Sequence, residues 1–501
     1  MVLLLLLLLP LVGGTAMLFA SSFTLRAVLL MTVALGHNIC SLLTTRQTLL
    51  AAGDPAFSTP TALGGVLYPD VLGLVFLCLA SALFTAASFY AIGYLRDEDA
   101  KAPVRRHFRD GSSFTNAPQQ RFLACLCFFL AAMSLVTTTQ HLGALWVGIE
   151  VTTLSSAPLI YFHRHKEALE ATWKYLMICS VGIALALLGN VLFSIAFYPE
   201  APQGHNQMLY YISHAAQAEP AWLKAAFIFL LVGFGTKMGL APLHNWLPDA
   251  HSQAPSLVSA LLSGALLNCA FLGILRGHQV LNAAGLGEFS SGLLVFFGLL
   301  SMLTAALFIV GQGHYKRLLA YSSVEHMGIL ALGVGLGGAA VYGAMLHSVC
   351  HSLTKCMLFL LAGNVLTHYH TLSSYDVRGM RWTMPITACL WAGGFLAITG
   401  SPPFGLFVSE FSILQHIFAT DRYVVGAIYL TLLAVIFVGM SLPFLRMVQG
   451  VTPPATQASY KETVYNVGPC LVLGVLILTL GMYVPAWLDS FLHQAAHLVG
   501  E

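Results

Sequence analysis

Apolar residues recur along the chain in runs of about 20, separated by short polar segments. Runs of this length match what a helix needs to cross the hydrocarbon core of a bilayer. The first run has no basic residues before it and a second run follows at once, so we expect a retained helix rather than a cleaved signal peptide. The pattern predicts 14 transmembrane helices, near residues 2–21, 26–44, 70–95, 121–138, 140–162, 171–198, 222–248, 256–276, 288–312, 319–338, 339–367, 386–420, 422–449 and 467–490.

Composition supports an all-α integral membrane protein. Mean hydropathy is +0.80, hydrophobic residues make up 57% of the chain and charged residues only 8%, against roughly 25% charged residues in soluble domains. The net charge of +2 is not gathered into a basic patch with aromatic residues, so nothing indicates nucleic-acid binding.

Basic residues lie mostly in the loops that follow the odd-numbered spans. Because basic loops face the cytoplasm, we expect a multi-pass protein of the cell's inner (cytoplasmic) membrane with both termini outside. The predicted cytoplasmic set is Arg26, Arg96, Lys101, Arg105, Arg106, Arg109, Arg121, Arg164, Lys166, Lys174, Lys316, Arg317, Arg378, Arg381, Arg446 and Lys461. Lys174 lies at the start of span six and could serve as a boundary anchor.

No cofactor site is visible in the sequence. The ten cysteines lie in or beside apolar spans and form none of the spaced clusters that iron–sulfur or zinc centres need. Gly333, Gly335 and Gly338 match G-x-G-x-x-G, but that motif requires a preceding strand, whereas these glycines end a membrane helix. We therefore favour close helix packing or a turn, and expect no cofactor, no metal and no redox centre on this chain.

Two predicted spans contain helix breakers. Pro242 interrupts span seven, and Pro402 and Pro403 interrupt span twelve. Because the two spans are five apart, equivalent units around them would cross the membrane in opposite directions, as in many transporters. We predict three N-terminal helices in 1–120, five-helix units at 121–276 and 277–449, and a C-terminal helix in 450–501. The alternative is that the two breaks are unrelated.

Rare charges lie beside these breaks. Lys237 is the only charge between residues 225 and 243, although a lysine at the centre of a membrane helix costs roughly 2.5–3.5 kcal/mol. We expect it to pair with Glu150, the mid-span acid of span five, because two unpaired buried charges cost more than a pair. The alternative is that Lys237 reaches the boundary along its own aliphatic stem. Glu410 follows the second break as an isolated acid.

His347, His351 and Lys355 have the spacing i, i+4, i+8, which places them on one face of span eleven. Glu325 and His326 lie in span ten. Histidine titrates near neutrality when it is unperturbed, so the ladder suits proton hopping. One alternative is a metal pair of His347 and His351, which the neighbouring lysine and the lack of a nearby carboxylate disfavour. Another is that the histidines only bond neighbouring helices.

Four long motifs resemble one family of membrane proteins. KMGLAPLHNWLPDAHSQAPSLVSALL, KRLLAYSSVEHMGIL, HSVCHSLTKCMLFLLAGN and GSPPFGLFVSEFSIL are similar to the antiporter-like subunits shared by respiratory complex I, Mrp-type cation/proton antiporters and group 4 membrane-bound nickel–iron hydrogenases. The resemblance covers about 120–450 and is nearest to the F component of hydrogenase-4. It implies fourteen helices with inverted five-helix repeats and a polar axis at the membrane midplane.

By the same resemblance, the proton-translocating positions are Glu150, Lys237, His326, His347, His351, Lys355 and Glu410. We add Glu325 because it lies next to His326, and expect Lys174, Asn268 and His244 as accessory positions. Asn268 stands where many relatives have a lysine, so a direct proton hop there is in doubt, and water or His326 would have to bridge. Glu325 is an added acid that would compensate for that lost lysine or tune His326. Because the sequence ends at Glu501, we expect no counterpart of the long lateral helix of the largest members.

The resemblance implies a proton-translocating subunit of a redox-driven complex. Its partners would be further antiporter-like subunits, a hydrogenase or quinone-reducing arm, and the lipid bilayer. The alternative is a cation/proton antiporter or ion-uptake partner that moves Na⁺ or K⁺ without redox chemistry. A pure scaffold is disfavoured by the intramembrane charges.

Overall fold

The computed structural model describes residues 1–53, 59–99, 106–107, 113–114, 116–197, 207–451 and 460–500. Thirteen helices or helical segments in this part of the chain are long and apolar enough to cross a membrane. They are α1 (Val2–Phe19), α2 (Phe23–Gly53), α3 (Val71–Asp99), α4 (Gln119–Thr138), α5 (Leu142–Ile160), α6 (Lys166–Ala196), α8 (Pro220–Met238), the continuous run α10–η3–α11 (Ser256–Leu261, Leu262–Leu266 and Leu267–Ala283), α12 (Gly287–Ile309), α13 (Tyr315–Leu336), α14 (Ala339–Tyr369), α18 (Tyr423–Val448) and α19 (Val464–Met482). Three predicted cytoplasmic charges, Lys101, Arg105 and Arg109, lie outside the described residues.

Shorter elements complete the fold. They are η1 (Leu63–Gly65), the hairpin β1 (Arg106–His107) with β2 (Ser113–Phe114), α7 (Met208–Ser213), η2 (Ala215–Gln217), α9 (Trp246–Gln253), α15 (Met380–Thr383), α16 (Pro385–Ile398), α17 (Gly405–Ala419) and α20 (Ala486–Val499).

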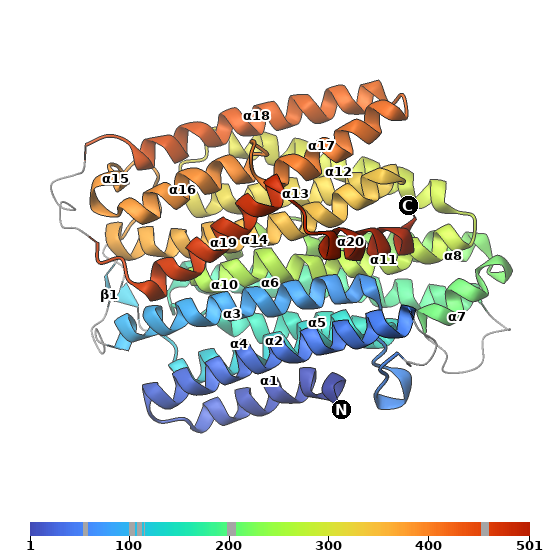
Figure 1. Cartoon of the computed structure of the whole chain (residues 1–501), viewed down its shortest axis with the longest axis horizontal. Coiled ribbons are helices and arrows are strands. Elements are labelled where there is room, and N and C mark those ends of the chain that lie inside the picture. The colour runs from blue at the N-terminus through green and yellow to red at the C-terminus, as the bar shows by residue number, and fades with distance from the viewer. Residues whose placement is uncertain are drawn as a thin grey trace.

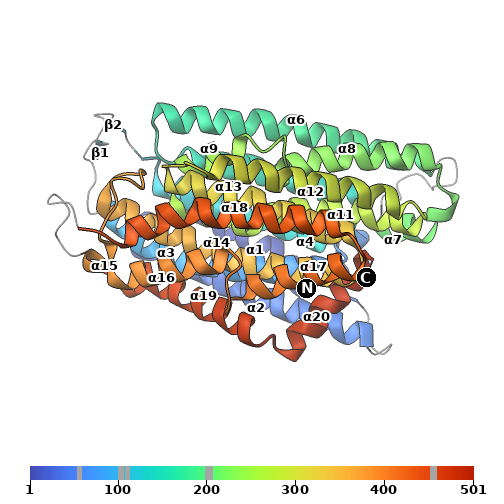
Figure 2. The ribbon, with the colours of Figure 1, turned by 90° about the horizontal axis from the view of Figure 1, so that it is seen from above.

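The long helices lie side by side along the length of the molecule, and α1 and α18 lie at opposite edges in Figure 1. Figure 2 shows the same lengthwise arrangement from above, with α6 and α8 along one edge. Both termini lie in the right-hand half of Figure 1, whereas α15 and the β1–β2 hairpin lie at the other end. The two termini thus lie on the same side of the bundle, as an even number of membrane crossings requires. Their location outside the cell membrane stays a prediction.

Both predicted helix breaks are present. Helix α8 ends at Met238, and Gly239 follows with φ 85°, a left-handed conformation that favours glycine. The chain becomes helical again only at Trp246, so the helix ends at Met238, four residues before the predicted breaker Pro242. At the second break, α16 ends at Ile398 and α17 begins at Gly405, with Pro402 and Pro403 between them. Helices α16 and α17 together fill the predicted twelfth span.

The predicted last span, 467–490, is wrong at its C-terminal end. Helix α19 stops at Met482 because Tyr483 is extended, and Pro485 then precedes a separate helix, α20. Helix α20 docks on α11, where the Gln279 side-chain amide donates to the Leu498 carbonyl at 2.8 Å. The hydropathy pattern predicts one span here because the residues on both sides of the break are apolar.

One connection occurs twice, five spans apart. His141 precedes α5 and His314 precedes α13, and each ring Nδ1 accepts the backbone N–H three residues on, at 3.2 and 3.3 Å. The backbone of His141 also bridges to Gln207, after α6, and that of His314 bridges to Ser373, after α14. Spans five and ten therefore begin in the same way; the five-helix units at 121–276 and 277–449 stay a prediction.

Candidate functional site

The Lys237 ammonium lies inside the bundle, hydrogen-bonded to two hydroxyl groups. Its ammonium donates to Thr153 Oγ1 of α5 at 2.8 Å and to the Tyr175 hydroxyl of α6 at 2.6 Å. The Tyr175 ring centroid lies 4.4 Å from Nζ, close enough for a cation–π contact. Lys237 is fully buried, so it does not reach the membrane boundary along its stem. The pocket holds a lysine charge without a carboxylate in contact.

The Tyr175 hydroxyl continues this network. Because it accepts from Lys237, its own hydrogen is free for Ser156 Oγ, 2.6 Å away. Ser156 in turn donates to the Thr152 carbonyl at 2.6 Å. The network therefore has a fixed direction, from the ammonium through two hydroxyls to the α5 backbone.

The predicted ion pair of Glu150 with Lys237 is wrong as a direct contact, because no ion pair within 4.0 Å joins them. Thr153 lies one turn after Glu150 on α5 and takes the lysine's hydrogen bond instead. Glu150 is only partly buried, with Thr153 and Ser180 as its hydroxyl neighbours. The two charges interact through space across the Thr153 side chain.

Asn268 connects α11 to α14. Its side-chain NH₂ donates to the Gly264 carbonyl at 3.0 Å and to Ser352 Oγ at 2.7 Å. Ser352 lies on α14, the helix that also carries His347 and His351, so Asn268 connects α11 to that helix. The side chain is 2% exposed, and the two hydrogen bonds from its NH₂ group hold it in this position.

The other two accessory positions differ from Asn268. Lys174 is about half exposed and pairs with Glu170 at 2.6 Å and with Asp249 at 3.1 Å, which fits a boundary anchor. His244 lies in the turn between α8 and α9, where its ring centroid is 6.3 Å from that of Tyr321. Neither residue bonds Lys237 or the histidines.

Three histidines form one cluster across two helices. His326 of α13 faces His347 and His351 of α14, with ring centroids 5.1 and 5.0 Å away. His347 and His351 are 6.5 Å apart and nearly parallel. All three are fully buried. His326 of α13 thus extends the predicted series on α14, because its ring lies opposite both His347 and His351.

Hydrogen bonds fix which nitrogen of His347 carries its proton. Ser409 donates to the Leu406 carbonyl at 2.8 Å, so its oxygen is left to accept from His347 Nδ1 at 3.0 Å. In neutral His347 the lone pair is then on Nε2, which lies 3.0 Å from His326 Nδ1. His326 must therefore donate to His347, which leaves His326 Nε2 as a lone pair.

Two buried charges flank the histidines: Lys355 lies one turn after His351 on α14, and Glu325 directly precedes His326 on α13. Lys355 is fully buried and donates to the Leu319 carbonyl of α13 at 2.7 Å. Glu325 is close enough to Lys355 for electrostatic interaction, but the two form no ion pair within 4.0 Å. Glu325 Oε2 has no hydrogen-bond partner. Each charge is buried without a direct counter-charge.

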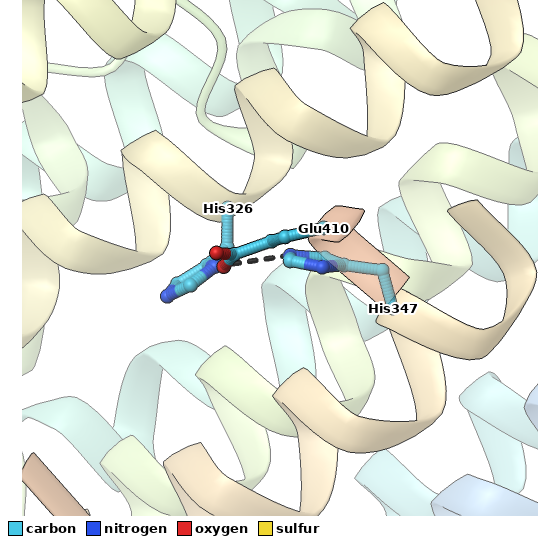
Figure 3. Close-up of side chains that lie close together, drawn as sticks. All are labelled: His326, His347 and Glu410. Atoms are coloured by element: carbon cyan, nitrogen blue, oxygen red, sulfur yellow. Dashed lines mark hydrogen bonds between the residues drawn. The ribbon is translucent and has the colours of Figure 1, made fainter. Parts of the chain in front are cut away.

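Glu410 joins the histidines rather than standing apart from them. It extends from α17, just after the second helix break, and its ligand atoms lie within 4.8 Å of those of His326 and His347 (Figure 3). Glu410 is 7% exposed, and its Oε1 has no partner. The carboxyl packs against Gly400, where a Cβ would overlap it. The break therefore makes room for the acid.

Thr153, Tyr175, Ser409 and Tyr429 are among the residues of this site that were not identified from the sequence. The hydroxyl-rich run TTLSS, which begins two residues after Glu150, was a usable signal for Thr153. Tyr175 and Ser409 had none, because only the packing of helices brings them to Lys237 and His347. The Tyr429 hydroxyl of α18 is buried without a partner, and Glu410 and Glu325 are its electrostatic neighbours.

Residues 139–438 match the family model described as NADH:quinone oxidoreductase/Mrp antiporter, TM. The chain belongs to this family. It is 35% identical to the Hydrogenase-4 component F homolog of Methylacidiphilum infernorum over 84% of this chain and 86% of that one. It is 29% identical to Hydrogenase-4 component B of Escherichia coli over 85% of this chain and 64% of that one. The resemblance seen in the motifs is confirmed.

Solved structures of the antiporter family share the fold. A chain of the Mrp complex from Dietzia sp. superposes with a TM-score of 0.84 at 19% identity, covering 99% of this chain and 97% of that one. A chain of respiratory complex I from Thermus thermophilus gives 0.80 at 21% identity, with both chains fully covered. The protein is a multi-pass, antiporter-like membrane subunit, and its buried lysine, histidine and glutamate residues fit proton translocation.

Proposed function

We propose that the protein carries protons across the membrane through the buried residues between Lys237 and Glu410. The observation that carries this proposal is the cluster of His326, His347 and Glu410 in the bundle interior, to which Lys237, also fully buried, adds a further proton-binding group. Each charged or imidazole group can bind and release a proton, and hydroxyls or amides lie between them. Glu150 supplies a partly buried acid at one end, and Glu325 and Lys355 supply further proton-binding groups beside the histidines.

Chemistry favours the proton over Na⁺ or K⁺ as the ion. Selective alkali-cation sites surround the ion with oxygen atoms, whereas this cluster offers two imidazoles and one carboxylate, with the His351 ring and the Lys355 ammonium nearby. A proton needs only hydrogen bonds such as the one of 3.0 Å between His326 and His347. The two five-helix units would place this route along the membrane midplane.

The partners follow from the relatives' names. Because they are components of hydrogenase-4, the Mrp complex and complex I, we infer that this chain works beside further antiporter-like subunits and a hydrogenase or quinone-reducing arm. That arm would hold the redox cofactors, with none on this chain. The setting would be the inner (cytoplasmic) membrane with both termini outside.

A second candidate is a cation/proton antiporter or ion-uptake partner without redox chemistry, which the likeness to the Mrp chain favours. One experiment separates the two. The assembled complex is reconstituted into vesicles, and proton movement is followed with a pH-sensitive dye in Na⁺, K⁺ and choline buffers. Redox-driven proton uptake in all three buffers supports the proposal. Proton movement that requires Na⁺ or K⁺ and no electron donor supports the second candidate.

A further inference from the structure

We propose that His326, His347 and Glu410 form an inhibitory binding site for a transition-metal ion, with Zn²⁺ as the best match. The three residues come from three helices, α13, α14 and α17, that meet only in the folded bundle. Their ligand atoms all lie within 4.8 Å of one another, and all three side chains are buried. Figure 3 shows the two rings and the carboxylate turned toward one another.

The donor set selects the kind of metal. Two imidazole nitrogens and one carboxylate oxygen are a common protein set for Zn²⁺, whereas Ca²⁺ and Mg²⁺ require oxygen ligands throughout. Three protein ligands leave one position for water. The cluster therefore matches a zinc-type ion with an open coordination position.

The surroundings already orient one ligand. A histidine that binds metal usually donates its other N–H to a fixed acceptor, which sets the tautomer. His347 Nδ1 donates in this way to Ser409 Oγ at 3.0 Å, and Ser409 is itself held by the Leu406 carbonyl. The Nε2 lone pair of His347 consequently points into the cluster.

One further ligand atom is unsatisfied, because Glu410 Oε1 is buried and has no hydrogen-bond partner. His326 turns Nδ1 toward His347 Nε2 at 3.0 Å, so Nδ1 is its ligand atom and must release its proton when a metal binds. A bound metal would supply the partner that Glu410 Oε1 lacks. It would also occupy His347 Nε2, so the hydrogen bond from His326 would be lost and protons could not pass between the rings.

The metal pair that the sequence analysis considered, and disfavoured, was a different one. His347 and His351 have the right spacing, but no carboxylate is near them along the chain. The fold instead supplies Glu410 from α17 and pairs His347 with His326 across the helices. Both ring nitrogens of His351 are buried without partners, yet His351 does not belong to the three-residue group. It is therefore a matched control on the same helix, one turn away.

The test is a metal titration of the purified complex after chelator treatment. Co²⁺ is added and its visible absorption followed, Zn²⁺ is used as competitor, and bound metal per chain is counted after dialysis. We expect one buried ion per chain. His347→Gln and Glu410→Gln should each weaken binding about tenfold or more, as should Ser409→Ala through loss of the orienting bond. His351→Gln should bind as the unaltered protein does.

Three results would overturn the site: no bound metal in the unaltered complex, binding unchanged in both ligand variants, or binding lost in His351→Gln alone. Elution volume and thermal unfolding identify a variant that fails to fold, and Ser409→Ala, which leaves all three ligands in place, then decides. Inhibition of transport by Zn²⁺ rests on the proposed function and is measured separately. Binding without inhibition would keep the site and remove the cluster from the proton route.

Discussion

Replacing Lys237 with methionine should abolish proton transport while leaving the protein folded. The ammonium makes two hydrogen bonds, to Thr153 and Tyr175, and a charged donor contributes about 1.5–3 kcal/mol to each. Against this, methionine removes a buried charge whose desolvation costs several kcal/mol. Tyr175 keeps its bond to Ser156, and Thr153 keeps its bond to the Ile149 carbonyl. We therefore expect the free energy of unfolding to change by no more than about 2 kcal/mol.

Transport should respond very differently. A methionine thioether cannot bind a proton, so translocation should fall about 100-fold or more, the order of a lost proton-transfer group. Lys237→Arg is the matched control, because arginine keeps the charge but does not release its proton. Dye-monitored proton uptake into vesicles is compared with thermal unfolding of the same preparations. Near-normal uptake by Lys237→Met, or full uptake by Lys237→Arg, would refute the reasoning.

The remaining predictions concern the histidine cluster and the two ends of the bundle. His351→Gln keeps a hydrogen-bonding side chain but cannot take up a proton near neutrality, so vesicle transport should slow sharply while metal content stays the same; unchanged transport would contradict its role. Asp70→Asn breaks the bidentate pair with the buried Arg276, which should lower the free energy of unfolding by about 3–5 kcal/mol in thermal unfolding. Burial raises the pKa of Asp70, but the Arg276 charge and hydrogen bonds leave that pKa below its usual value, so this stabilisation should be intact above about pH 3.9 and decline only in stronger acid. Burial and the Lys316 and Arg317 charges lower the pKa of His314 to about 4. Below about pH 6.5 the unfolded chain therefore binds more protons than the folded one. The free energy of unfolding should fall between pH 6.5 and pH 4, by less than about 3 kcal/mol. His314→Asn keeps an acceptor at the start of α13 and should flatten that part of the curve; an unchanged pH profile would show that His314 is not the group responsible.

Helix positions could be predicted because length and hydropathy determine them almost alone. Thirteen long helices and the α16–α17 pair correspond one to one to the fourteen predicted spans, although α2 ends nine residues after the predicted residue 44 and α8 ends ten residues before the predicted residue 248. The predicted end of the last span is wrong at α19 because an apolar run does not reveal where the backbone turns. At the first break, proline marked the region, but Gly239 ends the helix because its left-handed backbone favours glycine.

The site was predictable as a set of residues and not as an arrangement. A lysine, glutamate or histidine in an apolar span stands out because burial is expensive, and Lys237, His347, His351 and Glu410 were found in this way. Which of them touch depends on helix packing. Thr153 therefore displaced Glu150 as the direct partner of Lys237, and Glu410 joined the histidines from a distant helix. Tyr175 carries no charge and gave no signal.

Proton transport by Glu410 variants tests the central claim most directly, because this acid joins the histidine cluster to the second helix break. Redox-driven proton uptake is measured in vesicles of the assembled complex with Glu410→Gln, Glu410→Asp and Glu410→Ala, beside thermal unfolding of each. Translocation by the cluster predicts that Gln blocks uptake at unchanged stability and that Asp retains part of it, since only the proton-binding group is essential. Full uptake in Glu410→Gln, with stability lost only in Glu410→Ala, would show that the acid supports the broken helix and does not carry protons.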